Sequence, residues 1–321
     1  MYKIVWNKLR PTVQRLRALA ADVQGHVLNC QQPSRYPTVV MYHSVSQEAK
    51  RNWGPWKYAT TPEVFDQQLY RINNKYTVIS LDDVVEWMLY GKSIPHNSLV
   101  LTFDDAYCDF QSQALPILEK YEFQATLYAS TALLGRSGAP FEYRLGELLR
   151  NQQYINIKLD DIHINSSLAT NAQVLDCYNR IRNKLKYSSP DRRERFFNTI
   201  GTDLQLTDVI LNPEELRELQ KHPLVTIGAH GHEHVPFTAL PGTAQKENVT
   251  KCRNQLEKIL GTSPRHFSFP YGSFNKSAIR AIKEAGFKSA VTTQSRPISA
   301  RDWGRPYTIP RIDAATKSIV S

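Results

Sequence analysis

The sequence predicts an α/β domain built on a mainly parallel sheet or barrel. From Tyr36 onward, short apolar runs alternate with segments of helical periodicity, a pattern typical of βαβ units. The chain has 321 residues, of which 41% are hydrophobic and 22% charged, so it can bury a full core. We therefore expect one domain over residues 36–321, preceded by a separate segment at residues 1–35.

The segment at residues 1–35 is predicted to form a basic amphipathic helix. Val5, Leu9, Val13 and Leu16 recur at helical spacing, with lysines and arginines between them. Such a helix docks on its own domain or makes peripheral contact with an anionic membrane, and the sequence leaves both open. The segment lacks the apolar core and the cleavage site of a secretory signal. We therefore expect a cytoplasmic protein, with membrane association through this helix as the alternative.

Eight short apolar runs are predicted to form the strands of the domain. They are Thr38–Tyr42, Thr77–Ser80, Ser98–Phe103, Ala125–Ser130, Leu224–His230, His266–Phe269, Ser289–Thr292 and Tyr307–Ile309. Three of the predicted helices have recognisable ends: Pro62–Asn73 after the cap Thr61, Ala244–Leu260 before Gly261, and Lys276–Ala285 before Gly286.

An insertion is predicted at about residues 140–215. The strand expected to end at Ser130 and the one expected to begin near Leu224 are separated by about 90 residues, whereas an ordinary connection has roughly 4–6. Arg144–Arg150 and Val174–Leu185 have helical patterns. We therefore expect a small helical insertion and not a second catalytic domain.

The net charge and the cysteines narrow the class of protein. The formal charge is +10, from 40 Lys and Arg against 30 Asp and Glu. Such a charge would favour binding to nucleic acid, anionic lipid or an acidic polymer. No zinc-finger or RNP motif occurs, so we expect no nucleic-acid partner and a solvated basic surface. The four cysteines form no Cys-x-x-Cys pair, which indicates neither a disulfide framework nor a cysteine metal site.

The first chemical motif is a pair of adjacent carboxylates, Asp104 and Asp105, that follows the apolar strand Ser98–Phe103. In parallel α/β folds, active sites form at the carboxyl ends of the strands. Adjacent residues that leave a strand point in different directions. One carboxylate could therefore bind a metal while the other acts as a base, although a solvated Asp-Asp loop is a common alternative.

The second motif contains three histidines after another apolar strand. His230 and His234 are four residues apart, so their imidazoles can face one metal ion. Two histidines and one carboxylate would leave coordination positions open, as a catalytic metal site requires. His232 has no assigned role and is expected to face solvent or to support the other two.

The third motif is the Phe-Pro-Tyr-Gly sequence that ends at Gly272. A proline with fixed φ, followed two residues later by glycine, makes a rigid turn. Such a turn can direct the backbone N–H of Tyr271 at a developing oxyanion, although it can also be only a strand end.

Together these motifs resemble those of the polysaccharide deacetylase family, the carbohydrate esterases with NodB-type homology. Thr102–Asp105, His230–His234 and Arg265–Pro270 occur in the order of the Thr-Phe-Asp-Asp, His-x-x-x-His and Arg-x-x-x-x-Pro motifs. The resemblance implies a distorted (β/α) barrel of seven or eight strands over roughly residues 36–312. It implies metal ligands Asp105, His230 and His234, and a catalytic base, Asp104. By the same resemblance, Arg265 would orient Asp104, the Tyr271 N–H would bind the oxyanion, and Pro270 would lie among the substrate-binding residues.

The resemblance also assigns the general acid. Many members carry a late histidine in a Leu-x-His motif, but the last histidine here is His266. His43 leaves the apolar strand Thr38–Tyr42, which is similar to the permuted arrangement of the poly-N-acetylglucosamine deacetylases. Two residues depart from the family pattern, Ala106 for glycine and Gly231 for serine or threonine. Asp302, Trp303 and Arg311 lie in segments that resemble family elements, but they receive no role.

An aromatic loop follows His43. Trp53, Trp56 and Tyr58 lie within seven residues, which is unusual for a solvated loop. We predict that they form a sugar-stacking wall beside the active site, with packing onto the barrel core as the alternative.

The resulting prediction is a hydrolase that uses one divalent ion, with zinc favoured by the imidazole ligands. It would remove N-acetyl groups from N-acetylhexosamine units of a surface or exopolysaccharide or its precursor, so its partner is an N-acetylated polysaccharide or oligosaccharide. Two alternatives remain: an O-acetyl esterase or another amidase on the same site, and a carbohydrate-binding protein with weak or no activity.

Overall fold

The computed structural model describes residues 34–51, 53–135, 139–150, 152–200, 206 and 208–314. The predicted amphipathic helix falls on residues 1–33, outside these ranges, so its docking or membrane contact stays a prediction. None of the helices in the described ranges has the length and apolar character needed to cross a bilayer.

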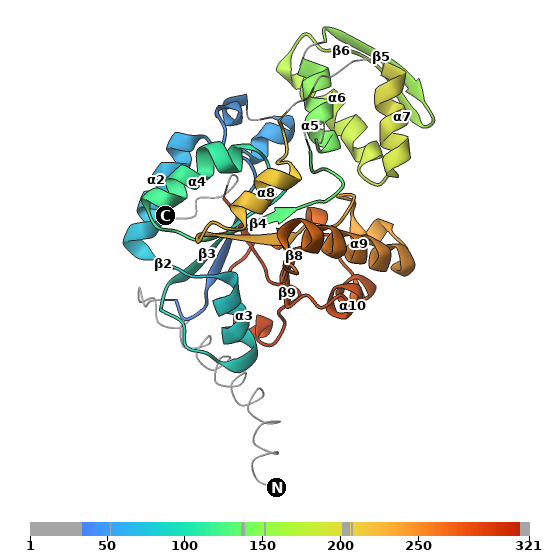
Figure 1. Ribbon diagram of the computed structural model, residues 1–321. Helices are drawn as coiled ribbons and strands as arrows, with labels where there is room; N and C mark the ends of the chain where they lie inside the picture. Colours follow the sequence, from blue (N-terminus) through green and yellow to red (C-terminus); the bar gives the residue numbers. More distant parts are fainter. Residues whose placement is uncertain are drawn as a thin grey trace.

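An eight-stranded parallel sheet curls through the centre of the domain, with helices packed around it (Figure 1). The strands follow the order β10–β1–β3–β4–β7–β8–β9, and β2 pairs with β3 beside this path. Their bounds are β1 Thr38–Tyr42, β2 Thr77–Val78, β3 Ser98–Phe103, β4 Ala125–Ala129, β7 Val225–Ala229, β8 His266–Ser268, β9 Ser289–Val291 and β10 Ile312–Asp313. The architecture confirms the predicted distorted (β/α) barrel.

The register brings the carboxyl ends of the central strands to one rim. Tyr42, the last residue of β1, is opposite Phe103 at the end of β3, and Ala129 of β4 is opposite Ala229 at the end of β7. Every pair in this sheet is parallel, so residues that directly follow these strands gather at the same edge.

The last segment of the described chain contacts both ends of the curled sheet. The predicted strand Tyr307–Ile309 contributes only one parallel bridge, between Ile309 and Val291 of β9. The paired strand is β10, which lies beside β1 through Val40 and Ile312. Pro310 separates the two contacts, and because proline has no N–H to donate, the ladder cannot continue through it.

Six helices connect the strands. They are α2 Pro62–Lys75, α3 Leu81–Tyr90, α4 Leu115–Lys120, α8 Pro213–Leu219, α9 Gly242–Leu260 and α10 Lys276–Glu284. The Thr61 hydroxyl accepts a hydrogen bond from the Val64 N–H at the start of α2, as an N-cap does. At the end of α9, Gly261 has a φ of 74°, in the left-handed region that glycine adopts at low cost. These helix ends confirm the predicted caps.

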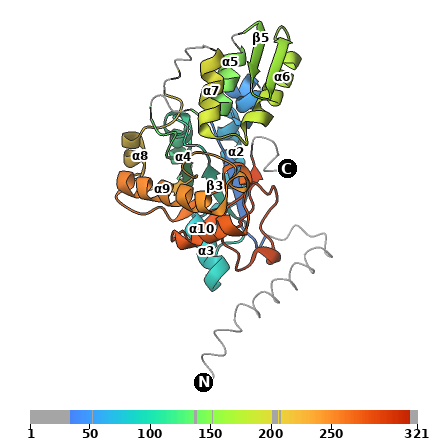
Figure 2. The same cartoon turned by 90° about the vertical axis from the view of Figure 1, so that its right-hand side faces the viewer.

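The insertion forms a lobe beyond one end of the sheet, as both views show (Figures 1 and 2). It consists of α5 Phe141–Arg150, β5 Tyr154–Leu159, β6 Ile162–Ser167, α6 Asn171–Leu185 and α7 Pro190–Ile200. Leu145, Ile181 and Phe196 are fully buried in its own hydrophobic core. The lobe is therefore a small packed unit and not an extended loop.

The antiparallel hairpin of β5 and β6 was not predicted, although the sequence carries its pattern. Along β5 buried and exposed residues alternate, with Ile155 and Ile157 inside. Asp160, in the connecting turn, has a positive φ of 50°, which aspartate tolerates better than most residues. Period-two alternation on both sides of an Asp-Asp pair indicates a hairpin.

The aromatic loop packs against the inserted lobe. The Trp53 ring meets Trp56 edge-on at 4.9 Å between centroids and Tyr178 of α6 at 6.1 Å. On α5, a Cβ added to Gly146 would lie 2.9 Å from the Pro55 ring, so only glycine allows this close approach. The loop and the lobe therefore share one tightly packed contact.

Replacing Trp56 with alanine should destabilise the protein by about 3–5 kcal/mol, because the ring is 3% exposed and its removal leaves a cavity. Chemical denaturation measures this loss. Tyr90→Ala is the control, since that side chain is 73% exposed and its loss should change stability by no more than about 0.5 kcal/mol. Equal effects of the two substitutions would contradict the packing role of Trp56.

Candidate active site

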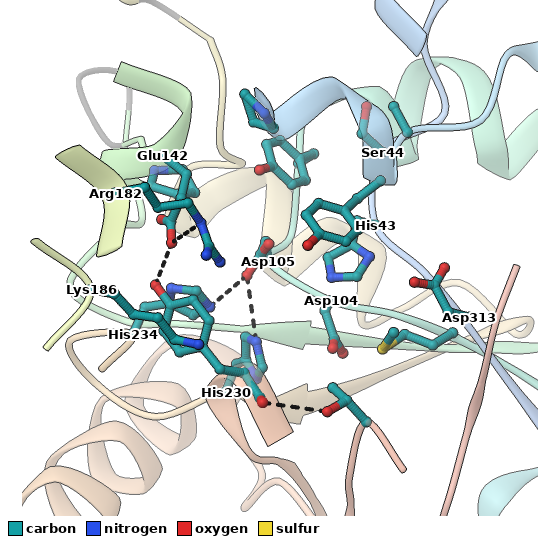
Figure 3. Close-up of a pocket in the computed structure, with 18 of the residues that line it drawn as sticks. His43, Ser44, Asp104, Asp105, Glu142, Arg182, Lys186, His230, His234 and Asp313 are labelled. Atoms are coloured by element: carbon teal, nitrogen blue, oxygen red, sulfur yellow. Dashed lines mark hydrogen bonds and ion pairs between the residues drawn. The ribbon is translucent and has the colours of Figure 1, made fainter. Parts of the chain in front are cut away.

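The strand ends surround a cavity of about 360 Å³ (Figure 3). From the barrel, it is lined by Met41, His43, Ser44, Asp104, Asp105, Tyr107, His230, His234, Tyr271, Thr293, Ser295 and Asp313. The aromatic loop and the inserted lobe add Pro55, Tyr58, Ala59, Pro140, Glu142, Tyr178, Arg182 and Lys186. The structure therefore brings the Asp-Asp pair, the two outer histidines, His43 and Tyr271 to one place, as the motifs predict.

Asp105, His230 and His234 form a compact cluster in which one potential ligand atom of each lies within 4.8 Å of the others. Asp105 Oδ1 is 3.4 Å from His230 Nε2 and 3.1 Å from His234 Nε2. All three side chains are buried. Among the described residues, this is the group of His, Cys, Asp and Glu side chains with a geometry that could hold a metal ion.

The hydrogen bonds around this cluster suit a cation. His230 Nδ1 is 2.8 Å from the Ser268 carbonyl oxygen, which must accept a hydrogen bond, so the proton is on Nδ1 and the Nε2 lone pair faces Asp105. Asp105 Oδ1 is buried and accepts no hydrogen bond from the described residues. Two imidazole nitrogens and one carboxylate oxygen thus converge without donors between them, and a divalent ion would satisfy all three.

The carboxylates also create a negative field at this point. Burial by itself lowers the pKa of His230, but Asp104 and Asp105 outweigh burial and raise it. The same field favours a metal cation beside the ring.

Four residues of the site have backbone in the left-handed region: Asp105 with φ 72°, Ala106 with 53°, His234 with 47° and Tyr271 with 59°. Each such residue other than glycine costs about 1–3 kcal/mol, and this strain persists only where the surrounding structure enforces it. Four of the eight non-glycine residues with positive φ in the described ranges lie in the segments that carry the predicted site residues. The barrel therefore holds these side chains in directions that relaxed strand ends would not give.

The two departures from the family pattern have local explanations. Ala106 occupies a position with positive φ where glycine would be unstrained, so this chain pays a backbone cost there. Gly231 has a φ of 75°, and an added Cβ would lie 3.0 Å from Asn248 Oδ1. Asn248 Oδ1 accepts a hydrogen bond from the His232 N–H, so a larger residue at 231 would disturb the turn that leads to His234. Neither departure removes an atom from the cluster.

Asp104 is held by Arg311. The guanidinium donates two hydrogen bonds to the carboxylate, Nη1 to Oδ1 at 2.8 Å and Nη2 to Oδ2 at 2.7 Å. The same two nitrogens also donate to hydroxyls, Nη1 to Thr102 and Nη2 to Ser268. The third nitrogen, Nε, donates to the Thr292 carbonyl. Arg311 is fully buried, so every one of these contacts is made away from water.

The prediction that Arg265 orients Asp104 is wrong. Arg265 precedes β8 and forms an ion pair with Asp82 instead, with its side chain 50% exposed. In a parallel sheet, a residue before one strand and a residue after another lie at opposite rims, so Arg265 and Asp104 cannot meet. Arg311, which the sequence left without a role, makes the contact.

The pair with Arg311 controls the ionisation of Asp104. Burial by itself raises the pKa of this carboxyl, but the Arg311 charge and the nearby His230 and His43 rings outweigh burial and lower the pKa to about 2. Asp104 is therefore ionised throughout the neutral pH range.

His43 faces the cavity from the end of β1, and its ring lies 5.6 Å from the Tyr58 ring. The segment after it is held by Asp109, which accepts hydrogen bonds from the Ser44 hydroxyl and, at 3.2 Å, from the Val45 N–H. Burial raises the pKa of Asp109 to about 7. Sequence reasoning missed Asp109, because nothing local distinguishes it from an exposed helix-cap aspartate.

The Phe-Pro-Tyr-Gly sequence forms a tight turn, with Tyr271 at a φ of 59°. An added Cβ on Gly272 would lie 2.0 Å from Thr293 Oγ1, so only glycine fits. The Tyr271 ring lies 4.8 Å from the His234 ring, and the Tyr271 hydroxyl donates to Glu142 Oε1 at 2.8 Å. Pro270 is buried behind Gly231 and is not among the lining residues, so the structure does not place it in the substrate cavity as predicted.

The predicted sugar-stacking wall is wrong for two of its three members. Trp53 and Trp56 pack against each other and the inserted lobe, and neither lines the cavity. Only Tyr58 does. The lobe supplies the apolar partner that these indoles cover, which the sequence could not show because the docking of the lobe is a long-range contact.

The residues left without a role have structural contacts. His232 is buried, with Nδ1 2.8 Å from the Thr131 hydroxyl, and burial lowers its pKa. Asp302 accepts two hydrogen bonds from Arg296, at 2.6 Å and 2.7 Å. The Trp303 ring packs edge-on against Trp87 at 4.8 Å. None of these residues lines the cavity.

Comparison with known proteins gives one consistent family. Residues 91–290, more than half of the chain, match the family model described as polysaccharide deacetylase. The chain is 23% identical over 257 residues to the poly-β-1,6-N-acetyl-D-glucosamine N-deacetylase of Escherichia coli (strain K12). This match covers 80% of the chain but only 34% of the relative, so the chain spans about a third of that protein.

Solved structures share the fold. The Streptococcus pyogenes deacetylase PplD, in complex with acetate, has a TM-score of 0.57 and 19% identity, covering 88% of this chain and 92% of its own. IcaB from Ammonifex degensii has a TM-score of 0.58 and 16% identity, covering 87% of this chain and 92% of its own.

Replacing Arg311 with methionine should destabilise the protein by about 3–5 kcal/mol at pH 7, because it leaves the Asp104 charge buried without its partner. Arg265→Met is the matched control, and its half-exposed ion pair should be worth no more than about 1 kcal/mol. Urea unfolding measures both, and equal losses would contradict the assignment to Arg311.

The same variants have a predictable pH dependence. In the parent, the low pKa of Asp104 contributes stability that is present above about pH 4 and is lost as the pH falls toward 2. In Arg311→Met this carboxyl takes up its proton at higher pH, which relieves the buried charge. The stability difference between parent and variant should therefore narrow as the pH is lowered from 7.

Proposed function

Since the chain belongs to the polysaccharide deacetylase family, we propose that it removes N-acetyl groups from N-acetylhexosamine units of a surface or exopolysaccharide, or of its precursor, with a divalent metal ion. The observation that carries this proposal is the convergence of the Asp105, His230 and His234 cluster with Asp104 and His43 around one cavity. The E. coli relative is named for a poly-β-1,6-N-acetyl-D-glucosamine substrate, which makes a polymer of that class the first to test.

Asp105, His230 and His234 would hold the ion, and zinc suits a site with two imidazoles and one carboxylate. When bound, such an ion supplies Lewis-acid polarisation of the acetamide carbonyl and lowers the pKa of water. The Ser268 carbonyl keeps the His230 ring in the orientation that this role needs.

Asp104 would act as the base. It is ionised at neutral pH, and Arg311 fixes the direction of both carboxylate oxygens. It can therefore accept a proton from the attacking water. Because its pKa is low, Asp104 holds that proton weakly and can release it as the tetrahedral adduct collapses.

His43 and Tyr271 complete the reaction. The rigid turn would present the Tyr271 backbone N–H to the oxyanion that forms when water attacks the acetyl carbonyl. His43 would protonate the departing sugar nitrogen, because an amine anion is too basic to leave at neutral pH. The products are acetate and a free amino sugar.

The alternative reaction is hydrolysis of an O-acetyl ester by the same groups. An alcohol leaves more readily than an amine, so an ester would depend less on His43. Acetate release from poly-β-1,6-N-acetylglucosamine oligomers and chitooligosaccharides, against O-acetylated xylan, distinguishes the two, each with and without a chelator. Glycan binding without chelator-sensitive turnover would instead indicate a binding protein.

We expect one zinc ion per chain, measured by elemental analysis of protein purified without chelator. His230→Ala and His234→Ala should lose it, because each removes one of three ligands. His232→Asn lies in the same motif but outside the cluster and should retain the metal. Full metal content in both alanine variants would exclude this cluster as the metal site.

His43→Ala should lower kcat for an N-acetyl substrate by about 10²–10⁴-fold, the usual contribution of a positioned general acid. Its metal content should match that of the parent, since His43 is not part of the ligand cluster. Steady-state acetate release measures the effect. An unchanged kcat would remove His43 from the mechanism.

A further inference from the structure

The inserted lobe gives the cavity a basic wall. The charged residues that the lobe contributes to the lining are Glu142, Arg182 and Lys186, one acid against two bases (Figure 3). Arg182 lies in the last turn of α6 and Lys186 directly follows the helix in helical backbone, four residues on, so both project from the same face. They face the cavity from the side opposite His43.

Lys186 has no acidic partner. Its ammonium lies 4.6 Å from the centre of the Tyr271 ring, and no carboxylate of the described residues comes within ion-pair distance of it. Burial, followed by the charge of Arg182, lowers the pKa of Lys186, and the charge of Glu142 only partly opposes them. The fold thus holds the Lys186 ammonium in a partly desolvated position, where the Arg182 guanidinium repels it.

Arg182 is only partly neutralised. Its nearest contact with Glu142 is 3.8 Å, longer than a hydrogen bond, and Glu142 Oε1 already accepts from the Tyr271 hydroxyl. Its side chain is 20% exposed, so part of it remains accessible. A guanidinium has five N–H donors, and the contacts of Arg182 with Glu142 and with the Tyr178 hydroxyl leave the others available for a ligand.

The basic residues of α6 that lie outside the cavity lining are paired differently. Lys184 bonds Asp161 at 2.7 Å, and Arg180 contacts Asp176 at 3.5 Å. Of these four basic residues, Arg182 and Lys186 are the two whose positive charge is not matched by a carboxylate of their own. Of the carboxylates on the other side of the cavity, Asp104 is bound by Arg311 and Asp105 lies against the two histidines. Asp313 lies across the cavity from Lys186 (Figure 3).

The wall lies within reach of a substrate at the metal cluster. The Tyr271 ring contacts both groups, with its centre 4.8 Å from that of the His234 ring and 4.6 Å from the Lys186 ammonium. A glycan whose acetamido group occupies the cluster would therefore place a neighbouring substituent or sugar beside Lys186.

We propose that Arg182 and Lys186 bind an anionic group of the substrate, so that the enzyme prefers an acidic N-acetylated glycan to a neutral one. The inference rests on the proposed deacetylase function and specifies its substrate class. The anion is an oxyanion, either a uronic acid carboxylate or a phosphate, both of which suit a guanidinium and an ammonium side by side.

The test compares three N-acetylated substrates: neutral chitotetraose, a hyaluronan tetrasaccharide that carries carboxylates, and N-acetylglucosamine 1-phosphate. Lys186→Gln and Arg182→Gln should raise KM for at least one acidic substrate by about 10–100-fold, the usual loss for a charged hydrogen bond. KM of Lys186→Gln for chitotetraose should not change. Lys184→Gln and Arg180→Gln are the matched controls on α6 and should leave all three values unchanged.

Lys186→Gln is the sharper variant, because Arg182 also contacts Glu142 and its loss could disturb the Tyr271 turn. Lys186→Arg should restore preference for the acidic substrate, which a purely structural role of the ammonium does not require. Thermal unfolding of each variant verifies the fold. The substrate whose KM responds identifies the anion as carboxylate or phosphate.

Calorimetry measures how tightly the metal-free protein binds the same acidic glycans. It tests the anion site independently of the proposed deacetylase function. Weaker binding to Lys186→Gln without acetate release from any substrate would support the anion site and contradict the deacetylase function. Acetate release from all three substrates with equal KM in parent and Lys186→Gln would overturn the anion site and leave the deacetylase function standing.

Discussion

The buried pair of Arg311 and Asp104 is the interaction on which the rest of the site depends. Arg311 comes from the closing segment of the chain and Asp104 follows β3, so their two hydrogen bonds join the last part of the barrel to its centre. The same guanidinium donates to the Thr292 carbonyl beside β9. A charge this deeply buried is costly unless every donor and acceptor around it is satisfied, so the pair requires the strands of the curled sheet to be in the correct register.

That requirement explains how one barrel rim can carry two adjacent carboxylates with different environments. Asp104 is neutralised by Arg311 and stays ionised, whereas Asp105, on left-handed backbone, turns toward His230 and His234. Burial alone would raise the pKa of Asp105, but the two imidazoles outweigh it and hold the pKa well below its usual range. The barrel thus separates a base from a metal ligand within one dipeptide.

The inserted lobe gives this barrel its particular cavity. The two tryptophans of the neighbouring loop pack against the lobe, and its Glu142 accepts a hydrogen bond from the Tyr271 hydroxyl. It also contributes Arg182 and Lys186 to the lining of the cavity. Its own hydrophobic core supports these side chains, and Trp53 and Tyr271 pack against that core from outside the lobe. The chemistry therefore belongs to the strand ends, while the wall that selects a substrate belongs to the lobe.

The sequence by itself determined the α/β barrel, most strand positions, the helix ends at Thr61 and Gly261, and the groups that follow β1, β3 and β7. These are short-range features, because a strand and the residues that leave its end are one continuous segment. It also carried the alternation of β5 and β6, which neighbouring helical patterns obscured. Only the tertiary structure decided that Arg311 and not Arg265 meets Asp104, and that Trp53 and Trp56 cover the lobe. Those outcomes depend on which distant charges and apolar surfaces are buried together, and no local pattern encodes a contact across 207 residues of chain.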